Sequence, residues 1–208
     1  QILTTIMPKW GVSYTYIDAD APENVWETAI TPATKMIYLE TPSNPGLELV
    51  DLEMVGHICK KHQLVFYVDN CFATPVSQRP IDFGADLVVH SATKWIDGQG
   101  RVLGGVIVGK KELIQQIYLF CRSTGPALSP FNAWVLSKSL ETLDVRMERH
   151  AANALHIAKA LEGHAKISWL KYPYLPSHPQ HAVALKHMKN GDGLISFNLT
   201  GGLESGRT

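Results

Sequence analysis

Short apolar segments that alternate with segments of helical periodicity are the feature that most constrains the fold of this chain. Such alternation is typical of α/β proteins, in which helices cover a largely parallel sheet. We expect strands at residues 12–17, 35–40, 64–69, 86–90 and 103–108, and helices at residues 22–30, 51–62 and 111–120. The sequence therefore predicts an α/β fold with a mainly parallel sheet.

The C-terminal third follows a different pattern. From residue 131 to residue 161 the apolar spacing is helical throughout, and a helix of this length could join two domains. A strand at 167–172, a helix at 178–189 and a strand at 194–199 would then begin a smaller α+β domain. We therefore expect a large domain over residues 1–144 and the start of a small one over residues 145–208. Because the chain begins without methionine and stops just after a strand-like stretch, we interpret it as an internal piece of a longer protein.

The composition limits the classes of partner. The 208 residues are 45% hydrophobic and carry a formal net charge of zero, so neither nucleic acid nor a membrane surface is indicated as a partner. No apolar run approaches the roughly 20 residues that a membrane-spanning helix needs. The three cysteines are widely spaced and odd in number, which favours a reducing compartment over a disulfide framework. We expect a cytoplasmic protein.

Chemically useful side chains follow three of the predicted strands. Asn44 lies shortly after the first, Asp69 ends the second, and Lys94 lies shortly after the third. Ligands of open α/β sheets bind beyond the carboxyl ends of the strands, so we expect these residues at one edge. This combination is what pyridoxal phosphate needs, because the lysine can bond its aldehyde and the carboxylate can keep its ring nitrogen protonated. The hydroxyls of Ser91 and Thr93 suit its phosphate.

Each of these residues also has a purely structural interpretation. A single lysine after a strand is usually a solvated surface residue, and Asp69 followed by Asn70 could be a turn. Ser91 and Thr93 could bond to backbone groups of a loop. The occurrence of all of them at one edge of the sheet favours the cofactor site.

Other motifs are weaker. Residues 104–110 have the spacing of a phosphate-binding loop but are filled with β-branched residues, which favours a strand. His178, His181 and His187 could bind a metal, but Pro179 and the lack of nearby carboxylates favour solvated histidines and no metal site. Cys71 has no evident partner base, so we interpret it as a packing residue.

Several runs of residues together resemble the Cys/Met-metabolism family of pyridoxal-phosphate enzymes. They are residues 40–45 (ETPSNP), 68–70 (VDN), 84–94 (GADLVVHSATK), 128–134 (LSPFNAW), 146–150 (RMERH) and 177–180 (SHPQ). The resemblance covers essentially the whole chain. It implies the fold of type I aminotransferases, with the site shared across a homodimer and the dimers paired into a homotetramer.

The resemblance also implies roles for individual residues. Lys94 would be the lysine that is joined to the cofactor, Asp69 the partner of the ring nitrogen, and Ser91 and Thr93 ligands of the phosphate. Asn44 would lie at the cofactor or the substrate. Further binding residues of the family would lie before Gln1 and after Thr208, so we expect an incomplete site and an inactive fragment when this chain is alone.

Residues 97–105 and 122–126 are most similar to the O-succinylhomoserine sulfhydrylases of this family. That similarity implies γ-replacement, in which O-succinylhomoserine or O-acetylhomoserine reacts with sulfide to give homocysteine in methionine biosynthesis. A methionine or cystathionine γ-lyase and a cystathionine γ-synthase are alternatives that use the same chemistry. A non-catalytic subunit or interaction domain is the alternative of another class.

Overall fold

A computed structural model describes residues 2–207 of the chain. The elements in chain order are η1 (Ile2–Ile6, a π-helix), η2 (Met7–Trp10, a 3₁₀ helix), α1 (Glu23–Ala29), β1 (Met36–Glu40), α2 (Leu52–His62), β2 (Val65–Asp69), α3 (Thr74–Ser77), η3 (Pro80–Phe83, a 3₁₀ helix), β3 (Leu87–Ser91), η4 (Ala92–Ile96, a π-helix), β4 (Gly105–Gly109), α4 (Lys111–Thr124), α5 (Pro130–Leu140), α6 (Leu143–Leu161), β5 (Ile167–Lys171), α7 (His181–His187), β6 (Ser196–Leu199) and α8 (Gly202–Ser205).

The main sheet has four strands in the order β1-β2-β3-β4. β1, β2 and β3 run parallel to their neighbours, and β4 pairs with β3 in the antiparallel direction. The register places Glu40 opposite Asp69, and Asp69 opposite Val89. The carboxyl ends of the three parallel strands therefore meet at one edge, as the sequence predicts, and the α/β fold is confirmed.

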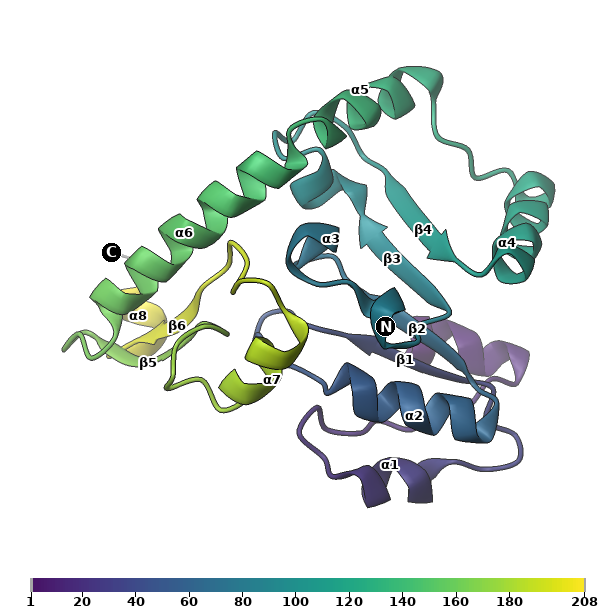
Figure 1. The fold of residues 1–208 in the computed structure, drawn as a ribbon, viewed down its shortest axis with the longest axis horizontal. Coiled ribbons are helices and arrows are strands. Elements are labelled where there is room, and N and C mark those ends of the chain that lie inside the picture. Colours follow the sequence, from purple (N-terminus) through teal and green to yellow (C-terminus); the bar gives the residue numbers. More distant parts are fainter. Residues whose placement is uncertain (1, 208) are drawn as a thin grey trace.

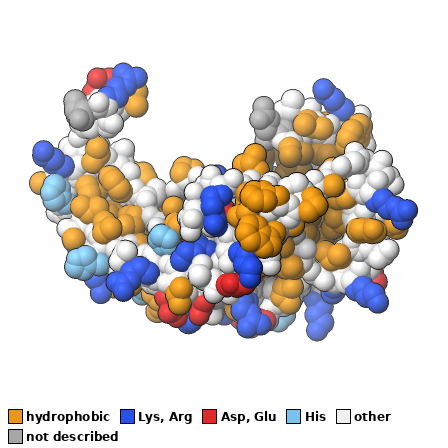
Figure 2. Space-filling view, turned by 90° about the horizontal axis from the view of Figure 1, so that it is seen from above, with side chains coloured by type: hydrophobic (Ala, Val, Ile, Leu, Met, Phe, Trp, Pro, Cys, Tyr) orange, Lys and Arg blue, Asp and Glu red, His pale blue; other side chains and the backbone are white. Residues whose placement is uncertain are grey.

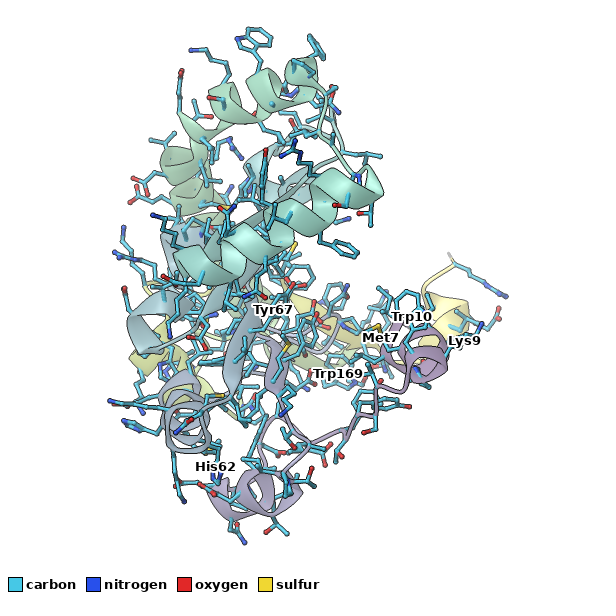
Figure 3. The ribbon with its side chains drawn as sticks, turned by 90° about the vertical axis from the view of Figure 1, so that its right-hand side faces the viewer. Met7, Lys9, Trp10, His62, Tyr67 and Trp169 are labelled. Atoms are coloured by element: carbon cyan, nitrogen blue, oxygen red, sulfur yellow. The ribbon has the colours of Figure 1, made fainter. Side chains whose placement is uncertain are left out.

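The two faces of this sheet differ. Phe66 and Val68 of β2 are fully buried against α2, whereas Tyr67 and Asp69, which alternate with them, are only partly buried on the other face. Figure 3 shows Tyr67 in the middle of the sheet, and the N-terminal segment that carries Trp10 stands away from it. Among the described residues, this second face is much less covered than the first, and it is the face on which Asp69 lies.

The helix that covers the first face is fixed by its own sequence. Asp51 precedes α2 and, as its N-cap, accepts hydrogen bonds from the N–H groups of Glu53 and Met54. Buried α2 residues join strand residues in the largest apolar cluster. Its members include Leu52, Val55, Ile58, Leu39, Phe66 and Val88.

The C-terminal part extends away from the sheet along α6. Figure 1 shows α6 running from α5 to the small two-stranded sheet of β5 and β6 and the nearby α7. Ala154 and Ala158 of α6 pack with Tyr172 and Leu175 in an apolar cluster that is separate from the core of the main sheet. The boundary predicted between residues 144 and 145 falls in the first turn of α6.

The structure corrects two expected elements. Residues 12–17 form no strand, and they are mostly exposed. The single helix expected over 131–161 is two helices, because Thr142 has φ −117° and ψ 3°, which are not helical values. Apolar periodicity continues across that break, so the sequence pattern does not reveal it. None of the helices in residues 2–207 combines the length and the apolar character needed to cross a membrane.

Candidate functional site

Asp69 lies at the carboxyl end of β2, where its carboxylate has no cationic partner among the described residues. Its Oδ1 accepts a hydrogen bond of 3.0 Å from the N–H of Cys71, and it takes part in none of the ion pairs between described residues. Burial raises the pKa of Asp69, and the Cys71 N–H only partly opposes this. A half-buried carboxylate without a cation is well suited to a positively charged ligand atom.

Two tyrosines share the same face of the sheet. Tyr38 and Tyr67 are paired in register on β1 and β2, and their ring centroids lie 5.0 Å apart. Burial, followed by the negative charge of Asp69, raises the pKa of Tyr38 to about 12 and raises that of Tyr67. Both phenols are therefore neutral at physiological pH. Sequence reasoning missed these residues, although their alternation with Glu40 and Asp69 places all four on one face.

Lys94 lies in η4, a single turn directly after β3. Asp97 N donates to Ala92 O at 2.8 Å, and Gly98 N donates to Lys94 O at 2.7 Å. Lys94 has non-helical dihedral angles of −86° and −118° inside this turn, and its side chain is exposed. Lys94 forms no ion pair with a described residue, so its amine is available to a ligand.

The Cys71 thiol is influenced by the charges of both Asp69 and Lys94. Its thiol lies 3.9 Å from the carbonyl oxygen of Ser91. Burial chiefly raises the pKa of Cys71; the negative charge of Asp69 adds to this, and the positive charge of Lys94 acts in the opposite sense. The thiol is therefore within electrostatic range of both charges.

The two hydroxyl residues already have protein partners. Thr93 Oγ1 donates to Gly104 O at 3.3 Å and accepts from Gly104 N at 3.1 Å, which ties η4 to the start of β4. Ser91, at the end of β3, interacts with the Cys71 thiol through its backbone and its hydroxyl, and both interactions lower the pKa of that thiol. The Thr93 hydroxyl is thus bonded to backbone groups of a loop, which is its purely structural interpretation. The role of Ser91 and Thr93 as phosphate ligands stays a prediction.

Asn44 also lies at this edge, where its backbone N–H contacts the Glu40 carboxylate. Burial raises the pKa of Glu40, the Asn44 backbone N–H opposes this by donating to the carboxylate, and the charge of Asp69 raises the pKa further. The Asn44 side chain is exposed. The structure therefore brings Asn44, Asp69 and Lys94 to one edge of the sheet, as the sequence predicts.

A buried polar network beneath this edge was not predicted. Gln78 Nε2 donates to Thr41 O at 2.8 Å and to Asn70 Oδ1 at 3.0 Å, and Asn70 Nδ2 donates to Gln78 O at 2.9 Å. All three residues are at most 2% exposed. The network joins the residues that directly follow β1 and β2, so it sets the relative positions of Glu40 and Asp69. A glutamine in a loop gives no sequence signal for this role.

Two of the three histidines are not solvated as the sequence predicts, whereas His181 is partly exposed. His178 and His187 are buried rather than solvated, at 4% and 6% exposure. His178 Nε2 lies 3.1 Å from Leu47 O, and His187 Nε2 lies 3.1 Å from Asp51 Oδ1. The sequence suggested solvent because it does not show that α2 and the loop after β1 pack against these segments. Within residues 2–207, no group of three His, Cys, Asp or Glu side chains is arranged to hold a metal ion.

Fold and sequence together define the class of protein. The chain matches the Cys/Met metabolism PLP-dependent enzyme family over residues 1–208, and it belongs to that family. The family is pyridoxal-phosphate-dependent, so the resemblance and the cofactor expected from the sequence are both confirmed.

Particular relatives have several activities. The chain is 45% identical to an O-succinylhomoserine sulfhydrylase of Mycobacterium tuberculosis over 95% of this chain and 49% of the relative. It is 44% identical to an L-methionine gamma-lyase of Treponema denticola over 97% of this chain and 51% of the relative. The crystal structure of metB from Corynebacterium glutamicum matches with a TM-score of 0.94 and 40% identity, over 99% of this chain and 54% of that one. The chain spans about half the length of these relatives.

The residues at the sheet edge fit the family's cofactor chemically. The carboxylate of Asp69 has no cationic partner among the described residues, and a protonated ring nitrogen could supply one. Lys94 offers an exposed amine near the same edge, and an amine is what an aldehyde requires.

Proposed function

We propose that the protein to which this chain belongs catalyses γ-replacement: O-succinylhomoserine, or O-acetylhomoserine, and sulfide give homocysteine and the free acid. The observation that carries the proposal is the placement of Asp69 and Lys94 at the ends of adjacent parallel strands, both within electrostatic range of Cys71. The identity to a relative named O-succinylhomoserine sulfhydrylase supports the choice of substrate.

In this proposal Lys94 is the lysine that joins the cofactor and later moves protons. When bound, pyridoxal phosphate supplies an electron sink that is conjugated to the substrate's α-carbon. Lys94 Nζ would remove the proton from the substrate's α-carbon and then assist removal of one from the β-carbon. Such general acid–base assistance contributes about 10²–10⁴-fold to a rate.

Asp69 would hold the protonated ring nitrogen of the cofactor. Its partly buried position makes the attraction between the two charges stronger than it would be in water. The carboxylate of the ester leaves from the γ-carbon as succinate, and hydrogen sulfide adds at the same carbon. The net change is the exchange of a C–O bond for a C–S bond, with no oxidant or reductant.

Ser91 and Thr93 are proposed as donors to the cofactor's phosphate, and Asn44 as a donor to the cofactor or the substrate. For Thr93 this requires its hydroxyl to turn away from the Gly104 carbonyl, because a hydroxyl has one proton to donate. The Gly104 N–H can still donate to the same oxygen, so the tie between η4 and β4 is not lost.

The test of Lys94 uses the full-length protein. Lys94→Ala is expected to lose the visible absorption band of the bound cofactor and nearly all activity, while the matched control Lys111→Ala retains both. Lys111 is exposed at the start of α4, away from this edge. A Lys94→Ala protein that kept the band and the activity would refute the assignment.

A γ-lyase or a cystathionine γ-synthase is the second candidate, favoured by the 44% identity to a relative named L-methionine gamma-lyase. Incubation with O-succinylhomoserine and either sulfide or cysteine separates homocysteine formation from cystathionine formation. Incubation with methionine alone reports lyase activity as methanethiol. A protein that binds no cofactor would instead be a non-catalytic family member.

We also propose that the full-length protein forms homodimers that pair into homotetramers. Large apolar side chains on and between α4 and α5 are exposed: Tyr118, Leu119, Phe120, Leu128, Phe131 and Trp134. Figure 2 shows hydrophobic side chains gathered over the half of the molecule in which α4 lies. An exposed apolar surface of this kind favours coverage by another protein surface.

Two further proposals concern organisation and location. The separate apolar clusters support a large domain over residues 1–144 and the start of a small domain over residues 145–208. Cys59, Cys71 and Cys121 are free thiols, which supports a reducing, cytoplasmic location.

A further inference from the structure

Two carbonyl groups at the end of η4, the turn of residues 92–96 that carries Lys94, accept hydrogen bonds from a side chain of another helix. This turn is called the Lys94 turn below. Arg146 of α6 donates from Nη1 to Trp95 O at 2.7 Å and from Nη2 to Ile96 O at 3.1 Å. A helical turn leaves its last carbonyl groups without backbone donors, and a cationic donor suits them. The residue directly after Lys94 is therefore held by a guanidinium that lies 51 positions further along the chain.

The same guanidinium is fixed at its other end. Nη2 also donates to Ser139 O at 3.0 Å, and Nε donates to Thr142 Oγ1 at 3.1 Å. The planar group thus joins the Lys94 turn to the end of α5 and the start of α6. Lysine could keep the charge but could not make these bonds together, because it lacks the rigid fork of donors.

The turn leaves room for Arg146 at one glycine. A Cβ at Gly98 would lie 2.2 Å from Arg146 Nη1, and Gly98 has φ +71°, which L side chains rarely adopt. The chain therefore has no side chain where the guanidinium approaches. The contact therefore depends on the guanidinium of Arg146 and on the absence of a side chain at Gly98.

α6 contacts the residue after Lys94 a second time. His150, one helical turn beyond Arg146, packs its ring against the Trp95 ring with 4.7 Å between centroids. Trp95 is thus held by α6 through both its carbonyl oxygen and its ring. A second arginine, Arg101, stabilises the loop that follows: it donates from Nε to Asp97 Oδ1 at 3.0 Å and from Nη2 to Ser139 Oγ at 2.6 Å.

We propose that Arg146 is a positioning residue that caps the Lys94 turn and fixes the direction from which the Lys94 amine reaches the cofactor and the substrate. This inference rests on the proposed role of Lys94 and extends it to α6. Arg146 itself is assigned no contact with substrate. A displacement of α6, which leads into the C-terminal part of the chain, would reach the Lys94 turn through this residue.

The chain offers a matched control on the same helix. Arg149 is exposed, and its side chain forms no hydrogen bond or ion pair with another described residue. The experiment compares Arg146→Lys, Arg146→Met, Arg149→Met and Lys94→Ala in the full-length, cofactor-loaded protein. The measurements are cofactor content, the pH titration of the visible band, the fraction of cofactor fixed to Lys94 by borohydride, kcat and KM.

The Arg146 variants are expected to bind cofactor and to become labelled on Lys94. Their visible band should titrate with a midpoint moved by about half a pH unit or more, about a threefold change in the equilibrium. Because a small misplacement of a reacting group is costly, kcat should fall about 10- to 100-fold, with KM within about threefold. Arg149→Met should match the wild type. A purely structural role would lower cofactor content and the unfolding temperature but leave the titration midpoint of the bound fraction unchanged.

Three results would overturn the inference. If the Arg146 variants matched Arg149→Met while Lys94→Ala lost the band, the positioning role alone would be wrong. If Lys94→Ala kept the band, the proposed function would fail, and this inference with it. If Arg146→Met did not fold, Arg146→Lys would decide, because it keeps the charge and the aliphatic stem; wild-type titration and kcat in that variant would refute the role.

Discussion

Replacement of Asp51 by alanine tests how the helix beneath the site is held. Asp51 accepts hydrogen bonds from Glu53 N at 3.0 Å and Met54 N at 3.1 Å, and so caps α2. Its carboxylate also lies 3.1 Å from His187 Nε2 and 3.1 Å from Lys186 Nζ, both of α7. One carboxylate therefore caps α2, which packs on the main sheet, and also contacts two side chains of α7 in the C-terminal part.

The expected loss of stability follows from these contacts. Loss of an aspartate N-cap costs about 1 kcal/mol. The His187 side chain is 2% exposed and its Nδ1 has no partner, so removal of Asp51 would leave the buried ring without a hydrogen bond, at about 1–3 kcal/mol. The Lys186 pair is about half exposed and adds about 0–1 kcal/mol. Together these give about 2–5 kcal/mol for Asp51→Ala.

Thermal unfolding of the variants measures this loss. For a chain of this size the midpoint should fall by about 4–20 °C in Asp51→Ala. Asp51→Asn keeps a good cap and an acceptor for His187, so we expect a loss of less than about 1 kcal/mol. Asp144→Ala, at an exposed first-turn position of α6, is the control and should change stability by at most about 0.5 kcal/mol.

The pH dependence gives a second check on Asp51. Burial alone would raise its pKa, but the Met54 N–H together with Lys186 and His187 lowers it. A lowered folded-state pKa contributes stability above the unfolded pKa, and this contribution is lost as pH falls through the folded value, below about pH 4. Asp51→Asn should lack that acid-side loss. The reasoning would be refuted if Asp51→Asn were as unstable as Asp51→Ala, or if Asp51→Ala matched Asp144→Ala.

Two further variants test the sheet edge. Asp69→Asn should retain cofactor but slow α-proton exchange in deuterated water by about 100-fold, and an unchanged exchange rate would remove Asp69 from the mechanism. In cofactor-free protein, burial raises the pKa of Asp69, so stability should fall as pH rises from about 4 through the raised folded value, and Asp69→Asn should abolish this dependence. Gln78→Leu should lower the free energy of unfolding by about 2–4 kcal/mol, because Thr41 O and Asn70 Oδ1 lose their donor. Thermal unfolding of this variant beside the exposed control Gln116→Leu measures the loss. Equal stability of the two variants would contradict the role of the network.

The local elements were largely predictable because their causes are local. The buried alternation of Phe66 and Val68, the N-cap at Asp51 and the helical spacing of α2 all lie within short stretches of sequence. Contacts between distant segments were not predictable. The burial of His187 depends on Asp51, which is 136 residues away, and the sequence pattern instead indicated solvent. The segment at 12–17 has a strand's alternation, but no strand of the described residues pairs with it.

For the site, the sequence by itself determined the residue types and their order. A lysine, a carboxylate and an asparagine follow successive parallel strands, and strand polarity requires that they share one edge. Only the tertiary structure decided how those residues are held. It places Thr93 on Gly104, Gln78 beneath Asn70, and Arg146 against the Lys94 turn. The physical reason is that strand direction follows from local patterning, whereas hydrogen bonds between side chains and distant carbonyl groups exist only after the separate elements have packed.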